Sequence, residues 1–280
     1  MTELTSVPTS DEDARLEREI DMEKVTSRDG TVIAYDKIGH GPVVILTLGA
    51  LNTRKSGIKL AKLLSTRFTV VTFDRRGRGN STDSTTYKLQ REVEDIAAII
   101  GAVGEPVYLY GHSSGGALAL EASLALRKKI RKLAVYEVPY ALDNSSRRAA
   151  AAYFKALKAL LADGRHEDAV ALFIRSVGVS DKQIQALKRM PMWKGLVRLA
   201  PTLAYDSKVL GKGHALPTVR LSTVATPTLV MHGGAGAATM QDAAKGISEA
   251  IPRAKFMTLA RQTHGVSPKV LAPVLEEYFR

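Results

Sequence analysis

The stretch VYLYGHSSGGALALEAS, residues 107–123, decides the fold. It begins with an apolar run, continues through Gly-His-Ser-Ser-Gly and ends in a segment rich in alanine and leucine. A G-x-S-x-G motif between a strand and a helix is typical of a nucleophile elbow, in which a sharp turn lifts the serine hydroxyl out of the sheet. Gly111 and Gly115 leave room for such a turn. The pattern predicts Ser113 as a nucleophile; a phosphate-binding or plain strand-to-helix turn is the alternative.

Short β-branched runs alternate with longer helical patterns on both sides of this stretch. Residues 31–39 and 42–49 are expected to be neighbouring strands joined by a tight turn. The alternation stops after Pro139, is replaced by helical patterns over 140–224, and resumes at Thr226. We therefore expect an α/β fold with a mostly parallel sheet of about eight strands, helices on both faces, and a core formed by 23–139 and 225–280. The helical insertion, residues 140–224, is expected to cap the carboxyl ends of the strands, where such sheets hold their sites.

Composition bounds the function classes. The chain has 280 residues and no cysteine, which excludes a disulfide framework, a cysteine metal site and a thiol nucleophile. Residues 1–22 contain seven acidic residues and two arginines, so we expect a flexible acidic tail. No signal peptide or membrane-spanning run is visible, and a cytoplasmic location is the expectation.

Because the formal net charge is +12, nucleic-acid binding must be considered. The basic residues are scattered at helical spacing, however, which favours a solvated basic face over nucleic-acid binding. Binding of anionic lipid or of an acidic substrate stands between these two interpretations.

A serine hydroxyl needs a base, and the base needs a carboxylate to orient it. Among six histidines, His264 is favoured because it lies in the loop between the last expected strand and the last expected helix; His232 is a competitor. The loop after strand 226–234 has no carboxylate between Gly233 and Met240, and Asp242 belongs to the next helix. Glu137 instead ends the strand that follows the nucleophile strand. We expect Glu137 to contact His264; the alternative is a structural carboxylate at the hinge of the insertion.

The strand order, elbow, insertion and terminal histidine loop resemble the α/β-hydrolase fold over residues 25–280. FDRRGRGNS (73–81) is also similar to the family's turn after its fourth strand, where Asp74 and Arg75 are expected only to tie the turn together. The resemblance implies an oxyanion hole formed by the backbone N–H groups of Ser114 and Ala50. The loop that holds Ala50 carries Leu48 in place of the family's usual histidine.

An acid at the position of Glu137 resembles two branches of that fold. Haloalkane dehalogenases place their acid there, and YEVPY (136–140) is similar to the Glu-x-Pro of zearalenone-lactone hydrolases. Dehalogenases use aspartate as nucleophile, so Ser113 does not imply dehalogenation.

These observations together imply a serine hydrolase that cleaves a carboxylic ester or lactone of a mainly apolar small molecule, with no metal or organic cofactor. The helical insertion should select the substrate; its residues 140–220 include 14 Lys/Arg and six Asp/Glu. Leu51, Tyr140 and Trp193 are candidates for substrate contact. The same triad used for acyl transfer, C–C hydrolysis or perhydrolysis, or a non-catalytic small-molecule binding protein, are the alternatives. The oligomeric state is left open.

Overall fold

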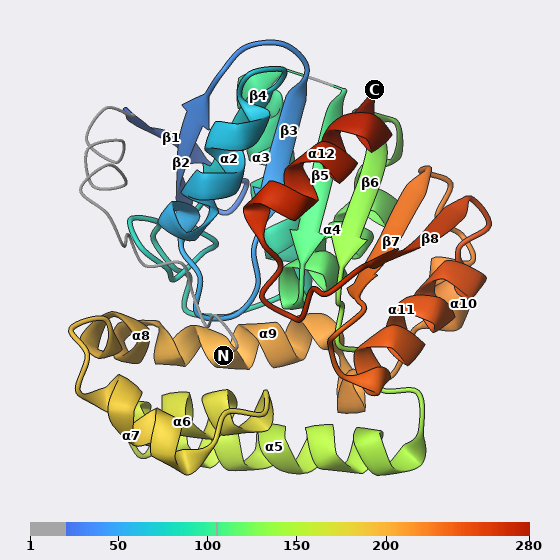
Figure 1. Ribbon diagram of the computed structural model, residues 1–280. Helices are drawn as coiled ribbons and strands as arrows, with labels where there is room; N and C mark the ends of the chain where they lie inside the picture. The colour runs from blue at the N-terminus through green and yellow to red at the C-terminus, as the bar shows by residue number, and fades with distance from the viewer. Residues whose placement is uncertain (1–20, 105) are drawn as a thin grey trace.

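A computed structural model describes residues 21–104 and 106–280, so nearly all of the predicted acidic tail lies outside the described residues. The described chain forms one eight-stranded sheet in the order β1-β2-β4-β3-β5-β6-β7-β8 (Figure 1). All pairs are parallel from β4 through β3 to β8, and β2 is antiparallel to both β1 and β4. The strands are β1 (Met22–Thr26), β2 (Val32–Ile38), β3 (Val43–Thr47), β4 (Thr69–Phe73), β5 (Val107–His112), β6 (Ile130–Tyr136), β7 (Thr228–Gly233) and β8 (Ala254–Leu259).

The prediction that the strands in 31–39 and 42–49 are neighbours is wrong, because β4 lies between β2 and β3. The connection crosses the start of β4 at close range. A Cβ on Gly39 would lie 2.4 Å from the carbonyl oxygen of Phe68, and one on Gly41 would lie 2.6 Å from that of Arg67. Both glycines have positive φ (82° and 105°), which side chains rarely adopt. The two glycines thus let a short loop step over an intervening strand.

Helices cover both faces of the sheet, as the alternation predicts. Neighbouring residues of β5 point to opposite faces, so Leu109 joins one core cluster and Tyr108 and Tyr110 join the other. The Leu109 cluster includes α3 (Leu89–Val103), α4 (Ser114–Leu126), part of α11 (Ala238–Ala250) and Leu221 of α10 (Thr218–Leu221). The tyrosine cluster includes α2 (Ile58–Leu64) and α12 (Pro268–Phe279). Short 3-10 turns η1 (Arg54–Gly57) and η2 (Arg127–Lys129) precede α2 and β6.

The helical insertion contains helices and turns, and an isolated bridge between Ala141 and Ala215 joins its two ends. Strands β5 and β6 point toward α9, and α5 to α9 lie together beyond those strand ends (Figure 1). A separate apolar cluster within the insertion includes Leu157, Ile174 and Trp193. The elements of the helical insertion are α5 (Asn144–Ala162), α6 (His166–Ser176), α7 (Asp181–Lys188), α8 (Trp193–Leu199), η3 (Ala200–Thr202), α9 (Leu203–Leu210) and η4 (Lys212–His214), followed by α10.

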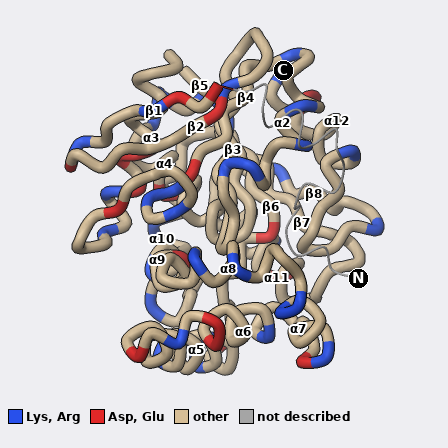
Figure 2. The backbone as a smooth tube through the Cα atoms, turned by 90° about the vertical axis from the view of Figure 1, so that its left-hand side faces the viewer, with Lys and Arg blue, Asp and Glu red and all other residues tan. Residues whose placement is uncertain are grey.

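Charge is distributed over the whole described chain. Figure 2 shows Lys and Arg segments on the sheet part and on helices α5 to α9, with Asp and Glu between them. Within the described ranges, none of the helices combines the length and the apolar character needed to span a bilayer.

Candidate active site

The loop between β5 and α4 holds Ser113 in a strained backbone conformation. Its φ of 57° and ψ of −130° are unusual for a residue with a side chain, and such strain is concentrated at functional sites. The Ser113 N–H donates to the carbonyl of Tyr136 at 3.0 Å, which ties the turn to β6. A Cβ on Gly111 would lie 2.5 Å from Gly116 Cα, and one on Gly115 would lie 2.3 Å from the carbonyl oxygen of Thr47. The motif glycines therefore permit the close packing that makes this sharp turn.

Glu137 follows β6 and is hydrogen-bonded through both carboxylate oxygens. Oε2 lies 2.8 Å from Nδ1 of His264, and Oε1 accepts the N–H of Gly233 at 2.9 Å. The carboxylate is buried, with 1% of the side chain exposed, whereas 33% of the His264 side chain is exposed. The expected contact between Glu137 and His264 is therefore present.

The loop after β7, where a carboxylate is usually found, is shaped around Glu137. Besides the N–H of Gly233, it brings Gly236 so close that a Cβ there would lie 2.9 Å from Glu137 Oε1. Asp242 lies in α11, and Glu137 is the carboxylate that contacts His264.

Two residues that sequence reasoning did not single out hold the loop of His264. The Tyr136 hydroxyl donates to the carbonyl of Thr263 at 2.5 Å, and His112 Nε2 lies 3.0 Å from the carbonyl oxygen of His264. Burial, and to a lesser extent the charge of His264, lowers the pKa of His112 to about 3. His112 is therefore neutral near pH 7, and Nε2 carries its proton because a carbonyl can only accept. The sequence signal that could have identified these two residues is their position, because His112 directly precedes Ser113 and Tyr136 directly precedes Glu137.

The two backbone groups expected to form an oxyanion hole lie beside the serine. Ser114 is the first residue of α4, so its N–H has no acceptor within the helix. The loop after β3 approaches from the other side: a Cβ on Gly49 would lie 2.9 Å from Ser113 Cβ and 3.3 Å from Ser113 Oγ. Ala50 is the next residue along that loop.

The loop after β4 forms a buried ionic network. Asp74 has the local role expected of it, since its carboxylate accepts the N–H groups of Arg54 and Asn80 at 2.7 and 2.9 Å. Arg75 reaches further than expected. It pairs with Glu92 of α3 at 2.6 and 2.7 Å and with Asp206 of α9 at 2.7 Å.

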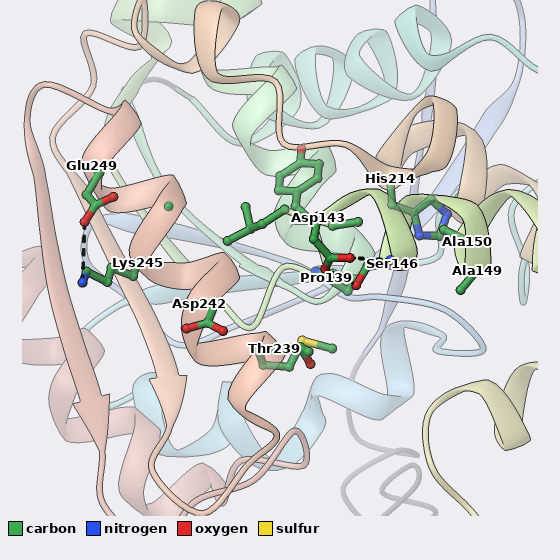
Figure 3. Close-up of a pocket in the computed structure, with 15 residues that line it drawn as sticks. Pro139, Asp143, Ser146, Ala149, Ala150, His214, Thr239, Asp242, Lys245 and Glu249 are labelled. Atoms are coloured by element: carbon green, nitrogen blue, oxygen red, sulfur yellow. Dashed lines mark hydrogen bonds and ion pairs between the residues drawn. The ribbon is translucent and has the colours of Figure 1, made fainter.

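The three candidates for substrate contact lie in two places. Leu51 and Trp193 share the apolar cluster of the insertion, and both are buried. Tyr140 instead lines a cavity of about 580 Å³ between the start of α5 and α11 (Figure 3). Asp242 lines the same cavity, but Ser113, Glu137 and His264 do not. The cavity is therefore distinct from the serine.

The competing histidine, His232, is engaged elsewhere. It is 2% exposed, and its Nε2 lies 2.8 Å from the hydroxyl of Thr258. Within residues 21–104 and 106–280, no group of three or more His, Cys, Asp or Glu side chains is arranged to hold a metal ion.

Comparisons with known proteins agree with this architecture. A solved α/β hydrolase from Sphaerobacter thermophilus is 43% identical and superposes with a TM-score of 0.83, covering 92% of this chain and 100% of that one. The uncharacterized hydrolase YraK of Bacillus subtilis is 26% identical over 112 residues, 39% of this chain and 41% of that protein. A probable protein phosphatase methylesterase 1 of Caenorhabditis elegans is 35% identical over 131 residues, 42% of this chain and 35% of that protein.

The match to these two curated relatives thus spans less than half of each. The family comparison covers more: residues 49–273 match the alpha/beta hydrolase family, a range that includes the elbow, the buried glutamate and the terminal histidine. With the eight-stranded sheet and helices on both of its faces, this match shows that the chain belongs to the alpha/beta hydrolase family.

Proposed function

We propose that this chain is a serine hydrolase that cleaves a carboxylic ester or lactone of a mainly apolar small molecule through an acyl-enzyme. The observation that carries the proposal is the 2.8 Å contact between Glu137 Oε2 and His264 Nδ1, in a protein whose Ser113 has the strained backbone of an elbow. Histidine oriented by a buried carboxylate is the arrangement that activates a serine hydroxyl.

In the first half of the reaction, Ser113 Oγ attacks the substrate carbonyl and its proton passes to Nε2 of His264. The contact with Glu137 keeps a proton on Nδ1, so Nε2 has a free lone pair to accept the second proton. Glu137 then stabilises the imidazolium cation. Because Gly233 holds the other carboxylate oxygen, the acid is positioned before substrate arrives.

The oxyanion that forms on the carbonyl is stabilised by the N–H groups of Ala50 and Ser114. Collapse of this intermediate expels the alcohol, which takes its proton from His264 and leaves an acyl group on Ser113. Water, deprotonated by His264, then attacks the acyl group, and a second oxyanion collapses to release the acid while His264 returns the proton to Ser113 Oγ. In a lactone, alcohol and acid are parts of one molecule, so the ring opens.

The choice of an apolar substrate is supported by apolar residues that adjoin the loop after β3. Leu51 lies two residues beyond Gly49, which packs on Ser113, and Leu51 belongs to the same apolar cluster as Trp193. We assign Leu51 and Trp193 to the apolar lining and treat the helical insertion as the cap that selects the substrate. Tyr140 lines the separate cavity of Figure 3, so we do not assign it to the lining around Ser113.

A panel of p-nitrophenyl acetate, p-nitrophenyl butyrate and aryl-substituted lactones tests the proposal, with Ser113→Ala as control. We expect turnover by the wild type, loss of turnover in Ser113→Ala, and covalent labelling of the Gly111–Gly115 peptide by a fluorophosphonate. Labelling without hydrolysis of any ester or lactone would indicate another reaction on the same residues. Absence of both would favour a binding protein.

A further inference from the structure

Arg78 lies under the predicted oxyanion loop and contacts it directly. Its side chain is 1% exposed, and Nη1 donates to the carbonyl of Gly49 at 2.6 Å. Nη2 donates to both carboxylate oxygens of Asp206, at 2.9 Å each. Arg78 therefore connects the loop after β3 to helix α9 of the insertion. Nothing in the mechanism above uses this contact.

The Gly49 carbonyl and the Ala50 N–H belong to the same peptide group. In a trans peptide these two groups point in opposite directions within one plane. A guanidinium that holds the Gly49 oxygen at 2.6 Å thus fixes the direction in which the Ala50 N–H points, away from Arg78. Gly49 packs against Ser113, so this peptide borders the reacting atoms. An oxyanion donor works only when it is aimed before charge develops.

Asp206 also contacts the side chain of Ser114, the residue whose backbone N–H is the second expected donor. Its Oδ1 accepts the hydroxyl of Ser114 at 2.7 Å, as well as Nη1 of Arg75 at 2.7 Å. Burial by itself would raise the pKa of Asp206, but Arg78 and Arg75 hold it below the ordinary value, so the group is ionised. Arg75 is paired in turn with Glu92. Two arginines and two carboxylates balance, so the network adds no net negative charge beside the developing oxyanion.

Helix α9, which carries Asp206, is fastened to the core next to this network. The hydroxyl of Tyr205 donates to Asp83 at 2.7 Å, and its ring stacks on Tyr87 with centroids 4.2 Å apart. Asp206 is thus held by its own helix as well as by the arginines. The insertion supplies a fixed part of the site and not only a cover.

We propose that Arg78 and Asp206 are positioning residues that aim the N–H groups of Ala50 and Ser114 at the substrate oxyanion; this inference rests on the proposed hydrolase function. Arg78 acts through the Gly49 carbonyl, and Asp206 acts through Arg78 and the Ser114 hydroxyl. One carboxylate of the insertion thereby acts indirectly on both donors of the oxyanion hole.

The test compares Arg78→Lys and Asp206→Asn with a matched control, Arg76→Lys. Arg76 is 0% exposed and is two residues away, but its guanidinium pairs with Asp95 at 2.7 Å and Asp29 at 2.9 Å, away from the loop after β3. A lysine at either position keeps the charge but loses the planar fork that bonds two acceptors. Melting temperatures identify variants that fail to fold. If Asp206→Asn is one of them, Arg78→Lys carries the test.

We measure kcat and KM for p-nitrophenyl butyrate, inhibition by butyrate, and inhibition by phenylboronic acid. Phenylboronic acid accepts the Ser113 oxygen on boron, the serine proton passes to His264, and the tetrahedral boronate places an oxygen in the oxyanion hole. Removing one oxyanion donor costs roughly 10²–10³ in rate, so misaiming one should lower kcat by roughly 10- to 100-fold. We expect boronate affinity to fall by the same factor, with KM and butyrate inhibition within about threefold of wild type. Arg76→Lys should leave all four quantities within about threefold.

Two results from the variants would overturn the inference. One is an equal loss of kcat in Arg76→Lys and Arg78→Lys; the other is a loss of kcat in Arg78→Lys with boronate affinity unchanged. If the wild type hydrolyses no ester or lactone, the proposed function fails, yet boronate affinity across the same variants still reads the positioning. If the wild type does not bind phenylboronic acid, the oxyanion hole itself is absent and this inference fails with it.

Discussion

Replacing Glu137 by glutamine tests the relocated acid most directly, because both carboxylate oxygens are engaged. Oε1 accepts the N–H of Gly233 at 2.9 Å, and Oε2 faces Nδ1 of His264 at 2.8 Å. Glutamine offers one acceptor and one donor in place of two acceptors. If its oxygen stays on Gly233, its NH₂ faces Nδ1 and forces the proton of His264 onto Nε2, where it blocks acceptance of the serine proton. If the amide turns over, its NH₂ meets the N–H of Gly233 and leaves that buried donor unpaired.

Either orientation removes stabilisation of the imidazolium, so the rate loss should be large. In a serine triad of another fold, the acid-to-amide change lowers kcat by roughly 10⁴. We expect a similar loss in Glu137→Gln for p-nitrophenyl butyrate hydrolysis and a parallel loss in the rate of fluorophosphonate labelling. Asp242→Asn is the matched control because Asp242 lines the separate cavity, and its kcat should stay within about threefold of wild type. A Glu137→Gln variant that melts normally and keeps more than about a tenth of the wild-type kcat would refute the assignment.

Three further comparisons of variants probe the surroundings of the site. Ser113→Gly should have a free energy of unfolding about 1 kcal/mol higher than that of Ser113→Ala, and therefore a higher urea midpoint, because glycine adopts a φ of 57° without strain and alanine does not; equal midpoints would argue against a strained elbow. Gly236→Ala should lower kcat by roughly tenfold, because its Cβ would lie 2.9 Å from Glu137 Oε1. A Cβ on Gly234 would have the methyl carbon of Thr258 as its nearest neighbour, at 3.1 Å, so Gly234→Ala should change kcat little; equal kcat values for the two would contradict this. Burial lowers the pKa of His112 to about 3, while the unfolded chain titrates near 6.5, so the wild type should lose stability relative to His112→Gln as pH falls from about 7 to about 5, by at most about 1.4 kcal/mol per pH unit; parallel urea curves at both pH values would rule out this contribution.

The fold was predictable from local pattern because strand–helix alternation restricts the topology. The elbow and seven of the eight strands were located to within a few residues, but β1 (Met22–Thr26) was not singled out. The order of the strands in the sheet was not predictable. The apolar pattern of a strand is the same whether the next strand of the chain pairs with it or lies beyond an intervening strand. The need for glycine at 39 and 41 becomes clear only from the structure, in which the backbone of residues 67 and 68 lies too close for a side chain.

The candidate site was predictable where residue type and strand end coincide, as for Ser113, Glu137 and His264. It was not predictable where the contact is made by backbone or between distant segments. Arg78 and Asp206 are 128 residues apart, and the acceptor for Arg78 on the other side is a carbonyl, which every residue has. Sequence spacing contains no signal for such a contact.

The proposed acid, Glu137, and a carboxylate on the turn after β7 would exclude each other. Glu137 needs room beyond the end of β7, and Gly236 provides it, because a Cβ on Gly236 would lie 2.9 Å from Glu137 Oε1. A carboxylate placed on that turn would therefore meet Glu137 at like charge in a buried site, which is costly. The segment HGGAGA (232–237), which includes the end of β7 and the turn after it, thus accommodates the Glu137 carboxylate, and its lack of an acid is part of the same arrangement. A glycine-rich turn after the next strand therefore favours the assignment of the catalytic acid to a glutamate at the end of the strand that follows the nucleophile.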